Sequence, residues 1–343
     1  QMEKIKNFFA TKTGIVLTGL FIGVLASLLQ KLGNPPNMGI CVACMERDIA
    51  GALGLHRAEV VQYMRPEIIG FVLGSFFSAL IFKEYRPRGG SSPFIRFILG
   101  VFAMIGALTF LGCPWRTLLR LAGGDGNAIF GFLGLITGIF IGTRFFKMGY
   151  SLGRTQTFPT KIAGIWFPLI MLFFFVLLIL DVYYQTNILF FSVKGPGSMH
   201  APVFISLLVG IFIGFIAQRS RFCTMGAFRD LILFRQLHLF LGVLALFISA
   251  FITNLILGQF NPGFENQPIA HTMQLWNFLG MALAGLAFAL AGGCPGRQLF
   301  LSGEGDADAA IFATGMIIGA AISHNLGLAA SPKGIGPHTP VAI

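Results

Sequence analysis

Apolar runs of about 20 residues follow one another through this chain, and each is roughly long enough to cross a bilayer as a helix. The chain is 55% hydrophobic and only 11% charged, whereas a soluble domain carries about a quarter charged residues. We therefore predict an all-α polytopic membrane protein. Nine spanning segments are expected, near residues 14–32, 66–83, 93–111, 127–146, 164–184, 202–218, 238–258, 274–291 and 308–326.

The first apolar run follows Lys4, Lys6 and Lys12 and so resembles a signal peptide. Because it is long and lacks a small-residue cleavage site, we interpret it as the first transmembrane helix. About two thirds of the 24 Lys and Arg residues fall in segments on the side of the N-terminus. The positive-inside rule then predicts a multi-pass protein of the bacterial inner membrane with a cytoplasmic N-terminus.

Charge and cysteine content exclude several classes of protein. The net charge of +11 comes from short segments between apolar runs, not from a basic patch with interleaved aromatics, so no nucleic-acid partner is expected. Five cysteines cannot all pair, and four lie at the ends of apolar segments, which argues against a disulfide framework. We expect no metal, since there is one C-x-x-C and no histidine pair at ligand spacing. We also expect no cofactor and no enzymatic activity, and the chain has no nucleotide-binding motif.

Two motifs occur twice in the chain. The sequence Gly112-Cys113-Pro114-Trp115-Arg116 returns 181 residues later as Gly293-Cys294-Pro295-Gly296-Arg297, and Gly124-Asp125 returns as Gly305-Asp306 at the same offset. A second pattern, C-x5-R-D, is shared by Cys41, Arg47 and Asp48 and by Cys223, Arg229 and Asp230. We infer that one unit is used twice.

Corresponding helices of the two units are five segments apart, an odd number, so the second unit is predicted to be inverted. Inverted repeats are typical of transporters, whose substrate site lies near the midplane between the halves. We divide the chain into a first repeat (1–150), a linker with a central transmembrane helix (151–200), a second, inverted repeat (201–330) and a C-terminal tail (331–343).

Each Cys-Pro pair predicts the start of a short helix, because proline is favoured at the first helical position. Cys113 and Cys294 should be the N-caps of helices near 114–122 and 295–302, which glycines then end. These helices are too short to span, so we interpret them as re-entrant half-helices with their N-termini inside the membrane. Such an N-terminus offers free N–H groups and partial positive charge, which favour an anion.

Arg116 and Arg297 fall at the third helical position, where a cation opposes the helix dipole at a cost of about 0.3–1 kcal/mol. An anion passing between the two N-termini would offset this cost, which places both arginines on a substrate pathway. The alternative is that they pair with Asp125 and Asp306 and lock the half-helices. Such a pair gains about 4 kcal/mol at 4 Å before desolvation, so both hypotheses stay open.

Two further pairs, Arg47 with Asp48 and Arg229 with Asp230, are interpreted as structural support. The cysteines Cys41, Cys113, Cys223 and Cys294 occupy matched positions beside glycine, proline or arginine, and we predict that they line the pathway. The alternative for any of them is a small buried apolar residue. We favour that alternative for Cys44, whose counterpart is Gly226.

Several of these motifs resemble a known family, the YeeE/YedE sulfur-transport membrane proteins: Gly39-Ile40-Cys41-Val42-Ala43-Cys44, Phe222-Cys223, Phe228-Arg229-Asp230 and Gly292-Gly293-Cys294. The stretch from Arg57 through Arg65-Pro66-Glu67 to Gly90 resembles the YedE-like selenium-transporter branch. The resemblance implies uptake of thiosulfate or a selenium compound, with essential thiols at a loop cysteine, here Cys41, and at Cys113 and Cys294. The Cys-Pro-x-Arg arginine of both halves departs from the thiosulfate carriers and leaves the substrate open between thiosulfate, selenite and similar anions.

The leading hypothesis is a transporter whose substrate enters near Cys41, passes Cys113 and Cys294, and leaves near Cys223. A second hypothesis is a transmembrane thiol-disulfide oxidoreductase with Cys41 and Cys44 as its outer pair. A third is a purely structural membrane partner of a cytosolic sulfur- or selenium-carrier protein, which would carry no solute. Replacing Cys44 alone separates the first two.

Overall fold

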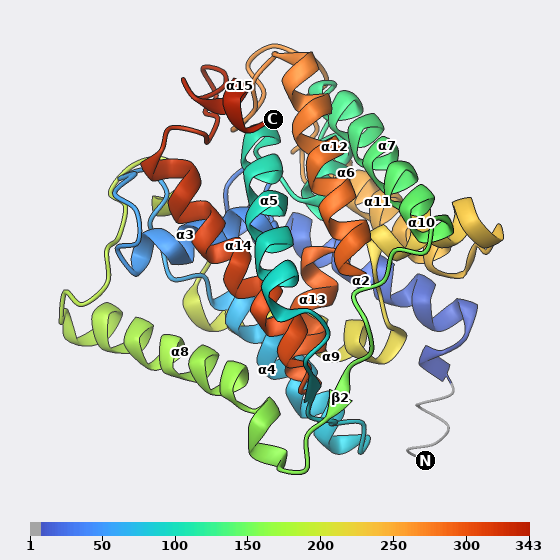
Figure 1. Ribbon diagram of the computed structural model, residues 1–343. Helices are drawn as coiled ribbons and strands as arrows, with labels where there is room; N and C mark the ends of the chain where they lie inside the picture. Colours follow the sequence, from blue (N-terminus) through green and yellow to red (C-terminus); the bar gives the residue numbers. More distant parts are fainter. Residues whose placement is uncertain (1–7) are drawn as a thin grey trace.

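The computed structural model describes residues 8–343 (Figure 1). Lys4 and Lys6, which entered the topology prediction, lie outside the described residues. Within this range the chain is helical apart from a short antiparallel ribbon of β1 (Arg88–Gly89) and β2 (Gln156–Thr157). Eight helices are long and apolar enough to cross a membrane: α2 (Lys12–Lys31), α5 (Pro93–Phe110), α7 (Asn127–Lys147), α8 (Trp166–Tyr184), α9 (Val203–Ser220), α11 (His238–Ile256), α12 (Gln274–Ala291) and α14 (Ala307–Asn325).

The predicted fold class is confirmed, since each of the nine predicted segments coincides with a helix of the structure. The remaining segment is α4 (Pro66–Ile81), an apolar helix of 16 residues that is shorter than the other eight. Its start is set by Pro66, whose fixed φ suits the first helical position. The same device starts α5 at Pro93.

Four short helices lie among the long ones: α3 (Val42–Ala52), α6 (Pro114–Ala122), α10 (Thr224–Phe234) and α13 (Pro295–Gly303). The sequence predicted α6 and α13, and α6 has the bounds expected. It did not predict α3 and α10, because neither begins with proline and both merge into apolar surroundings. All four begin directly after a cysteine.

The long helices pack in pairs that join distant parts of the sequence. The closest pairs are α2 with α11, α4 with α9, α5 with α14, and α7 with α12. Glycines allow the backbones to touch, as is usual between membrane helices. A Cβ on Gly19 would lie 1.9 Å from the carbonyl oxygen of Gly242, and one on Gly74 would lie 2.0 Å from that of Ile211.

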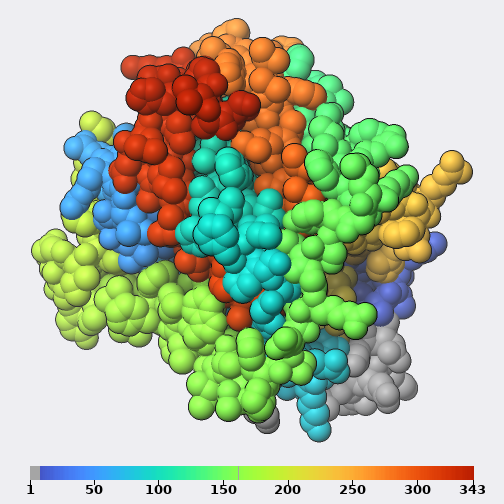
Figure 2. Space-filling model, viewed as in Figure 1, coloured from blue at the N-terminus to red at the C-terminus, as the bar shows by residue number. Residues whose placement is uncertain are grey.

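Helix α8 stands apart from this pairing. It lies along one side of the bundle, where it packs against α4 and α13, and its outer face is exposed (Figures 1 and 2). Short 3-10 helices precede and follow it, η1 (Lys161–Gly164) and η2 (Pro196–Ser198). The segment after α14 folds back onto the bundle and ends in α15 (Thr339–Ala342), where the Thr339 hydroxyl donates to the Leu328 carbonyl.

Candidate functional site

The four matched cysteines are the N-cap residues of the four short helices. Cys113 and Cys294 precede the prolines that start α6 and α13, as predicted. Cys41 and Cys223 adopt extended backbone and cap their helices through sulfur: the Cys41 Sγ accepts from the Cys44 N–H at 3.3 Å, and the Cys223 Sγ accepts from the Gly226 N–H at 3.2 Å. Every matched cysteine therefore sits at the positive end of a helix dipole.

These thiols form two groups, and all are free and buried. The first cysteine cluster comprises Cys41, Cys44 and Cys113, whose thiols are close enough to interact electrostatically. The second cysteine cluster comprises Cys223 and Cys294, whose sulfur atoms are 3.8 Å apart. Each cluster thus joins one cysteine of the C-x5-R-D motif to one of the Cys-Pro motif.

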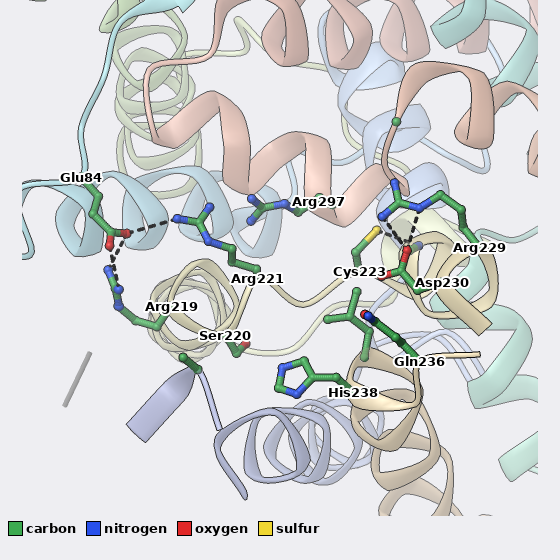
Figure 3. A pocket seen from close by; sticks show the side chains of 14 residues that line it. Glu84, Arg219, Ser220, Arg221, Cys223, Arg229, Asp230, Gln236, His238 and Arg297 are labelled. Carbon is green, nitrogen blue, oxygen red and sulfur yellow. Dashed lines mark hydrogen bonds and ion pairs between the residues drawn. The ribbon is translucent and has the colours of Figure 1, made fainter. Parts of the chain in front are cut away.

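A cavity of about 580 Å³ opens beside the second cluster, and we call it the arginine cavity (Figure 3). Four arginines line it together with Cys223: Arg219, Arg221, Arg229 and Arg297. The acidic lining residues are Glu84 and Asp230. The excess of positive side chains makes the cavity a favourable environment for an anion.

The arginines of this cavity differ in how firmly they are held. Arg219 bonds Glu84 at 2.8 Å, and Arg229 bonds Asp230 at 2.8 Å. Arg221 is mostly exposed and lies 3.7 Å from Glu84 and 3.9 Å from Glu304, while Arg297 lies 3.4 Å from Glu304. Arg221 and Arg297 are therefore the two that an anion could recruit at least cost.

The two half-helices α6 and α13 meet at their second residues. Trp115 on α6 is buried, and a Cβ on Gly296 of α13 would lie 3.3 Å from its ring. Aromatic side chains surround that ring, with Phe222 centred 5.6 Å away and Phe71 5.8 Å away. The Trp115 indole nitrogen has no hydrogen-bond partner. The Trp115 ring thus lies against the first turn of α13 and next to Phe222, the neighbour of Cys223.

The alternative in which Arg116 and Arg297 pair with Asp125 and Asp306 is wrong. Arg116 is fully buried and donates to backbone carbonyls, those of Leu111, Asn37 (3.2 Å) and Ile269 (3.2 Å), and lies 3.4 Å from the Cys44 sulfur. Asp125 instead bonds Arg120, one turn further along α6, at 2.6 Å.

Asp306 is likewise committed elsewhere. It caps α14 by accepting the Ala309 N–H, and its other oxygen bonds Arg88 at 2.7 Å. Arg297 pairs with Glu304, which lies closer in sequence. Each aspartate was misassigned because it begins the following helix, where its carboxylate serves the local backbone.

The other two predicted pairs are present. Arg47 bonds Asp48 at 2.6 Å, and Arg65 adds a second cation to Asp48 at 2.7 Å, with all three side chains buried. Arg229 and Asp230 make the equivalent pair at the arginine cavity, where both remain partly accessible. The equivalent pairs thus have unequal surroundings, one sealed and one open.

Some residues of the site were missed or misjudged from the sequence. Cys44 is not an isolated apolar residue, because its thiol contacts Arg116 and donates to the Leu111 carbonyl at 3.8 Å. Its C-x-x-C spacing to Cys41 was the available signal. Glu304, Arg219 and Arg221 gave no repeated pattern and could not have been found. Among residues 8–343 no group of three or more His, Cys, Asp or Glu side chains could hold a metal.

Comparison with known proteins bears on this site. The family described as "Sulphur transport" matches residues 219–341, which include the second cysteine cluster and most of the arginine cavity. The match covers little more than a third of the chain. The selenium branch that the sequence resembles is not distinguished by this match.

Two curated relatives match part of the chain, and both are named thiosulfate transporter TsuA. A thiosulfate transporter TsuA of Spirochaeta thermophila is 35% identical over 108 residues, 30% of this chain and 31% of the relative. A thiosulfate transporter TsuA of Escherichia coli is 29% identical over 108 residues, 31% of this chain and 30% of the relative. The matched segment is therefore less than a third of either relative. Both relatives are named as transporters.

Proposed function

We propose that this protein is a transporter that moves a small sulfur- or selenium-containing anion between its two cysteine clusters. The main support for this proposal is that the four matched cysteines cap four short helices and form two groups. One of these groups borders the arginine cavity. Thiols suit such a route because a weak, polarisable donor holds an anion loosely enough to release it.

The proposed route begins at Cys41 and Cys113, crosses between α6 and α13 beside Trp115, and ends at Cys294 and Cys223. Supporting it, Trp115 lies against Gly296 and next to Phe222, so its ring contacts residues that adjoin both cysteines of the second cluster. At the end of the route, Arg221 and Arg297 exchange their contacts with Glu84 and Glu304 for the anion. The remaining predicted residues, Arg47, Asp48, Arg229, Asp230, Asp125 and Asp306, hold the helices in place.

The pattern of helix packing supports the division into two related units. If α2, α4, α5 and α7 correspond to α9, α11, α12 and α14, the pair α2–α11 becomes α9–α4, and the pair α5–α14 becomes α12–α7. All four are among the closest pairs of the structure. A pseudo-twofold relation between an inverted pair of repeats predicts this exchange. With the N-terminus cytoplasmic, the arginine cavity faces the cytoplasm and the first cluster lies toward the outside.

The substrate is proposed to be thiosulfate, selenite or a similar anion. Support for thiosulfate comes from the two named relatives. Support for a more strongly charged oxyanion comes from the number of arginines at the cavity. A cytosolic sulfur- or selenium-carrier protein would receive the anion at that cavity.

The test is uptake of radiolabelled thiosulfate and radiolabelled selenite into proteoliposomes that contain the purified chain. We expect uptake of at least one anion, loss of that uptake in Cys113→Ala and Cys294→Ala, and its retention at the wild-type level in Thr137→Val, which changes an exposed position of α7. Uptake that survives both cysteine substitutions would exclude the cysteine route.

The thiol-disulfide oxidoreductase remains the second candidate, favoured by the 3.8 Å approach of the Cys223 and Cys294 sulfurs. Cys44→Ala separates the two functions. It removes half of the C-x-x-C but leaves the carbonyl contacts of Arg116 in place, so transport continues at a lower rate. An enzyme that exchanges thiols at Cys41 and Cys44 would be inactive.

A further inference from the structure

A cluster of buried polar side chains lies at the N-terminal ends of α4 and α9, away from the cysteines. Glu67, in the first turn of α4, is fully buried, and its Oε1 accepts from the Asn34 side chain at 2.7 Å and from the Ser206 hydroxyl at 3.0 Å. Ser206 belongs to α9, so Glu67 joins helices assigned to the two different repeats. The carboxylate of Glu67 has no role in the proposed movement of the anion along the cysteines.

Two polar atoms of this cluster have no partner. The second carboxylate oxygen of Glu67, Oε2, is buried without a hydrogen bond, and so is the hydroxyl of Tyr63, whose side chain is 3% exposed. The two side chains are close enough to interact electrostatically. Buried polar atoms are normally satisfied, and exceptions often mark a functional group. An intramembrane acid is itself a candidate for function.

The neighbouring cation does not neutralise Glu67. Arg65 is fully buried and its guanidinium is occupied by Asp48, by the Pro196 carbonyl at 2.8 Å and by the Met199 carbonyl at 3.0 Å. The other titratable groups around the cluster are Tyr63 and His200. Asp181 lines the adjacent cavity, but its carboxylate accepts from the Thr186 hydroxyl and from two backbone N–H groups.

A cavity of about 280 Å³ lies beside this cluster and is lined by Tyr63, though not by Glu67, and we call it the tyrosine cavity. Tyr63 and His200 line it, and their rings stack with centroids 4.2 Å apart. His200 is exposed, and burial of part of its ring together with the nearby Arg65 lowers the pKa of the imidazole. The tyrosine cavity lies at the end of α4 opposite Glu84 and the arginine cavity.

Glu67 is linked directly to the segment that carries Cys41. Asn34, which donates to Glu67, also donates to the Gly39 carbonyl at 2.8 Å, and its side-chain oxygen accepts the Ala201 N–H at 2.8 Å. Gly39 is two residues before Cys41. Four residues after Glu67 on the same helix face, Phe71 packs on Trp115. A change in the hydrogen bonds of Glu67 can therefore affect both the first cysteine cluster and the Trp115 ring.

We propose that Glu67 is the proton-binding residue that couples transport to a proton gradient, with the proton reaching it through the tyrosine cavity. This rests on the proposed transport function and adds its driving ion. In the unprotonated form, the charge of Glu67 strengthens the bonds from Asn34 and Ser206, since bonds to an ionised group are roughly twice as strong as neutral ones. Protonation weakens them, which frees the Cys41 segment and the α4–α9 contact to move.

The site suits a proton better than a metal cation. One open carboxylate oxygen and one hydroxyl are far fewer than the roughly six to eight oxygen ligands that calcium takes. A proton needs only the one open oxygen of Glu67.

The experiment measures radiolabelled thiosulfate in proteoliposomes with the membrane potential held at zero. An outside-acid gradient of about one pH unit should drive about tenfold accumulation per coupled proton, and a protonophore should abolish it. In Glu67→Gln the accumulation is lost, while exchange of internal for external thiosulfate continues because the cysteine route is intact. Glu46→Gln is the matched control, since Glu46 is a buried acid on α3 with no hydrogen-bond partner, and it should keep the coupling.

The outcomes separate this inference from the proposed function. If the wild type shows no thiosulfate or selenite flux, both are overturned. If it shows flux that is insensitive to the pH gradient, or driven by a sodium gradient instead, only the proton inference is overturned. Coupling that survives in Glu67→Gln, or that is lost in Glu46→Gln alone, also overturns it. Tyr63→Phe keeps the ring and should slow gradient-driven uptake without changing exchange, which tests the site if Glu67→Gln does not fold.

Discussion

Arg116 and Arg297 occupy matched positions in α6 and α13, yet their surroundings predict opposite consequences of the same substitution. Arg116 is fully buried and saturates three backbone carbonyls, those of Leu111, Asn37 and Ile269. Arg297 borders the arginine cavity and has one ion pair, to Glu304 at 3.4 Å. We expect Arg116→Gln to damage folding and Arg297→Gln to damage transport.

The magnitudes follow from these partners. A hydrogen bond to a charged group contributes about 1.5–3 kcal/mol, and a buried acceptor left without a donor costs about 1–3 kcal/mol. Glutamine can replace one of the three donors of Arg116, so two buried carbonyls are left without a donor. The free energy of unfolding should therefore fall by about 2–6 kcal/mol. The pair of Arg297 is also buried, but Glu304 keeps Arg88 at 3.3 Å when Arg297 is replaced, so its carboxylate is not left unpaired. Arg116→Gln should therefore lose more stability than Arg297→Gln.

The assay combines thermal unfolding of the detergent-purified variants with uptake of labelled thiosulfate and selenite. Arg116→Gln should melt well below the wild type, whereas Arg297→Gln should melt close to it but require about tenfold more substrate, as loss of one charged contact to an anion implies. Arg297→Lys should recover part of the affinity. A normally stable, inactive Arg116→Gln would refute the reasoning, because it would place Arg116 on the route as a substrate contact.

Three further predictions concern other parts of the molecule. Mild oxidation should join Cys223 to Cys294 in a disulfide, because their sulfurs need only approach from 3.8 Å to about 2.05 Å. Two titratable thiols and the transport activity should be lost, and a reductant should restore both. An unchanged number of titratable thiols would contradict the pairing. Trp115→Ala should cost about 3–5 kcal/mol and raise passive anion leak between the half-helices, whereas Trp115→Phe should not leak. Burial lowers the pKa of His200 and His271 below the ordinary 6.5, so the unfolded chain binds more protons as the pH falls below that value, and the melting temperature should fall with it; a flat profile would contradict this.

Most of the fold could be predicted from the sequence because membrane-spanning helices are recognised by the length and hydropathy of their apolar runs. Helix α12 begins and ends where the sequence predicted a spanning segment, at residues 274 and 291. The Cys-Pro pairs fixed the starts of α6 and α13 because proline restricts its own backbone. Helices α3 and α10 carry no such residue, so their starts depend on cysteine capping that the sequence pattern does not reveal.

The candidate site was predictable only in part. Repetition identified the four cysteines, since equal positions in two copies stand out without any structure. It could not assign partners, because Asp125 lies one helical turn nearer to Arg120 than to Arg116, and Asp306 meets Arg88 from a distant segment. Contacts over such distances depend on how the helices pack. The Glu67 cluster was invisible for the same reason, as it is assembled from three separate segments.

Under the proposed function, the unequal partners of the two arginines bear on how the anion enters and leaves the route. In the first half, three carbonyls hold Arg116 beside Cys44, so it supplies a fixed positive potential and has no donor to yield. In the second half, Arg297 and Arg221 share Glu304 as their ion-pair partner, and both guanidiniums can turn toward an arriving anion. A fixed potential attracts an anion without gripping it, whereas mobile cations bind it and then release it to the wide cavity. If the half-helices had kept equal arginines, the anion would meet the same affinity at both clusters. Under the proposed function, the divergence of Arg116 and Arg297 therefore gives the two ends of the route different rates of entry and release, while the gradients set the direction of net movement. Glu304→Gln removes the carboxylate that competes with the anion for Arg221 and Arg297, and it should slow release more than entry.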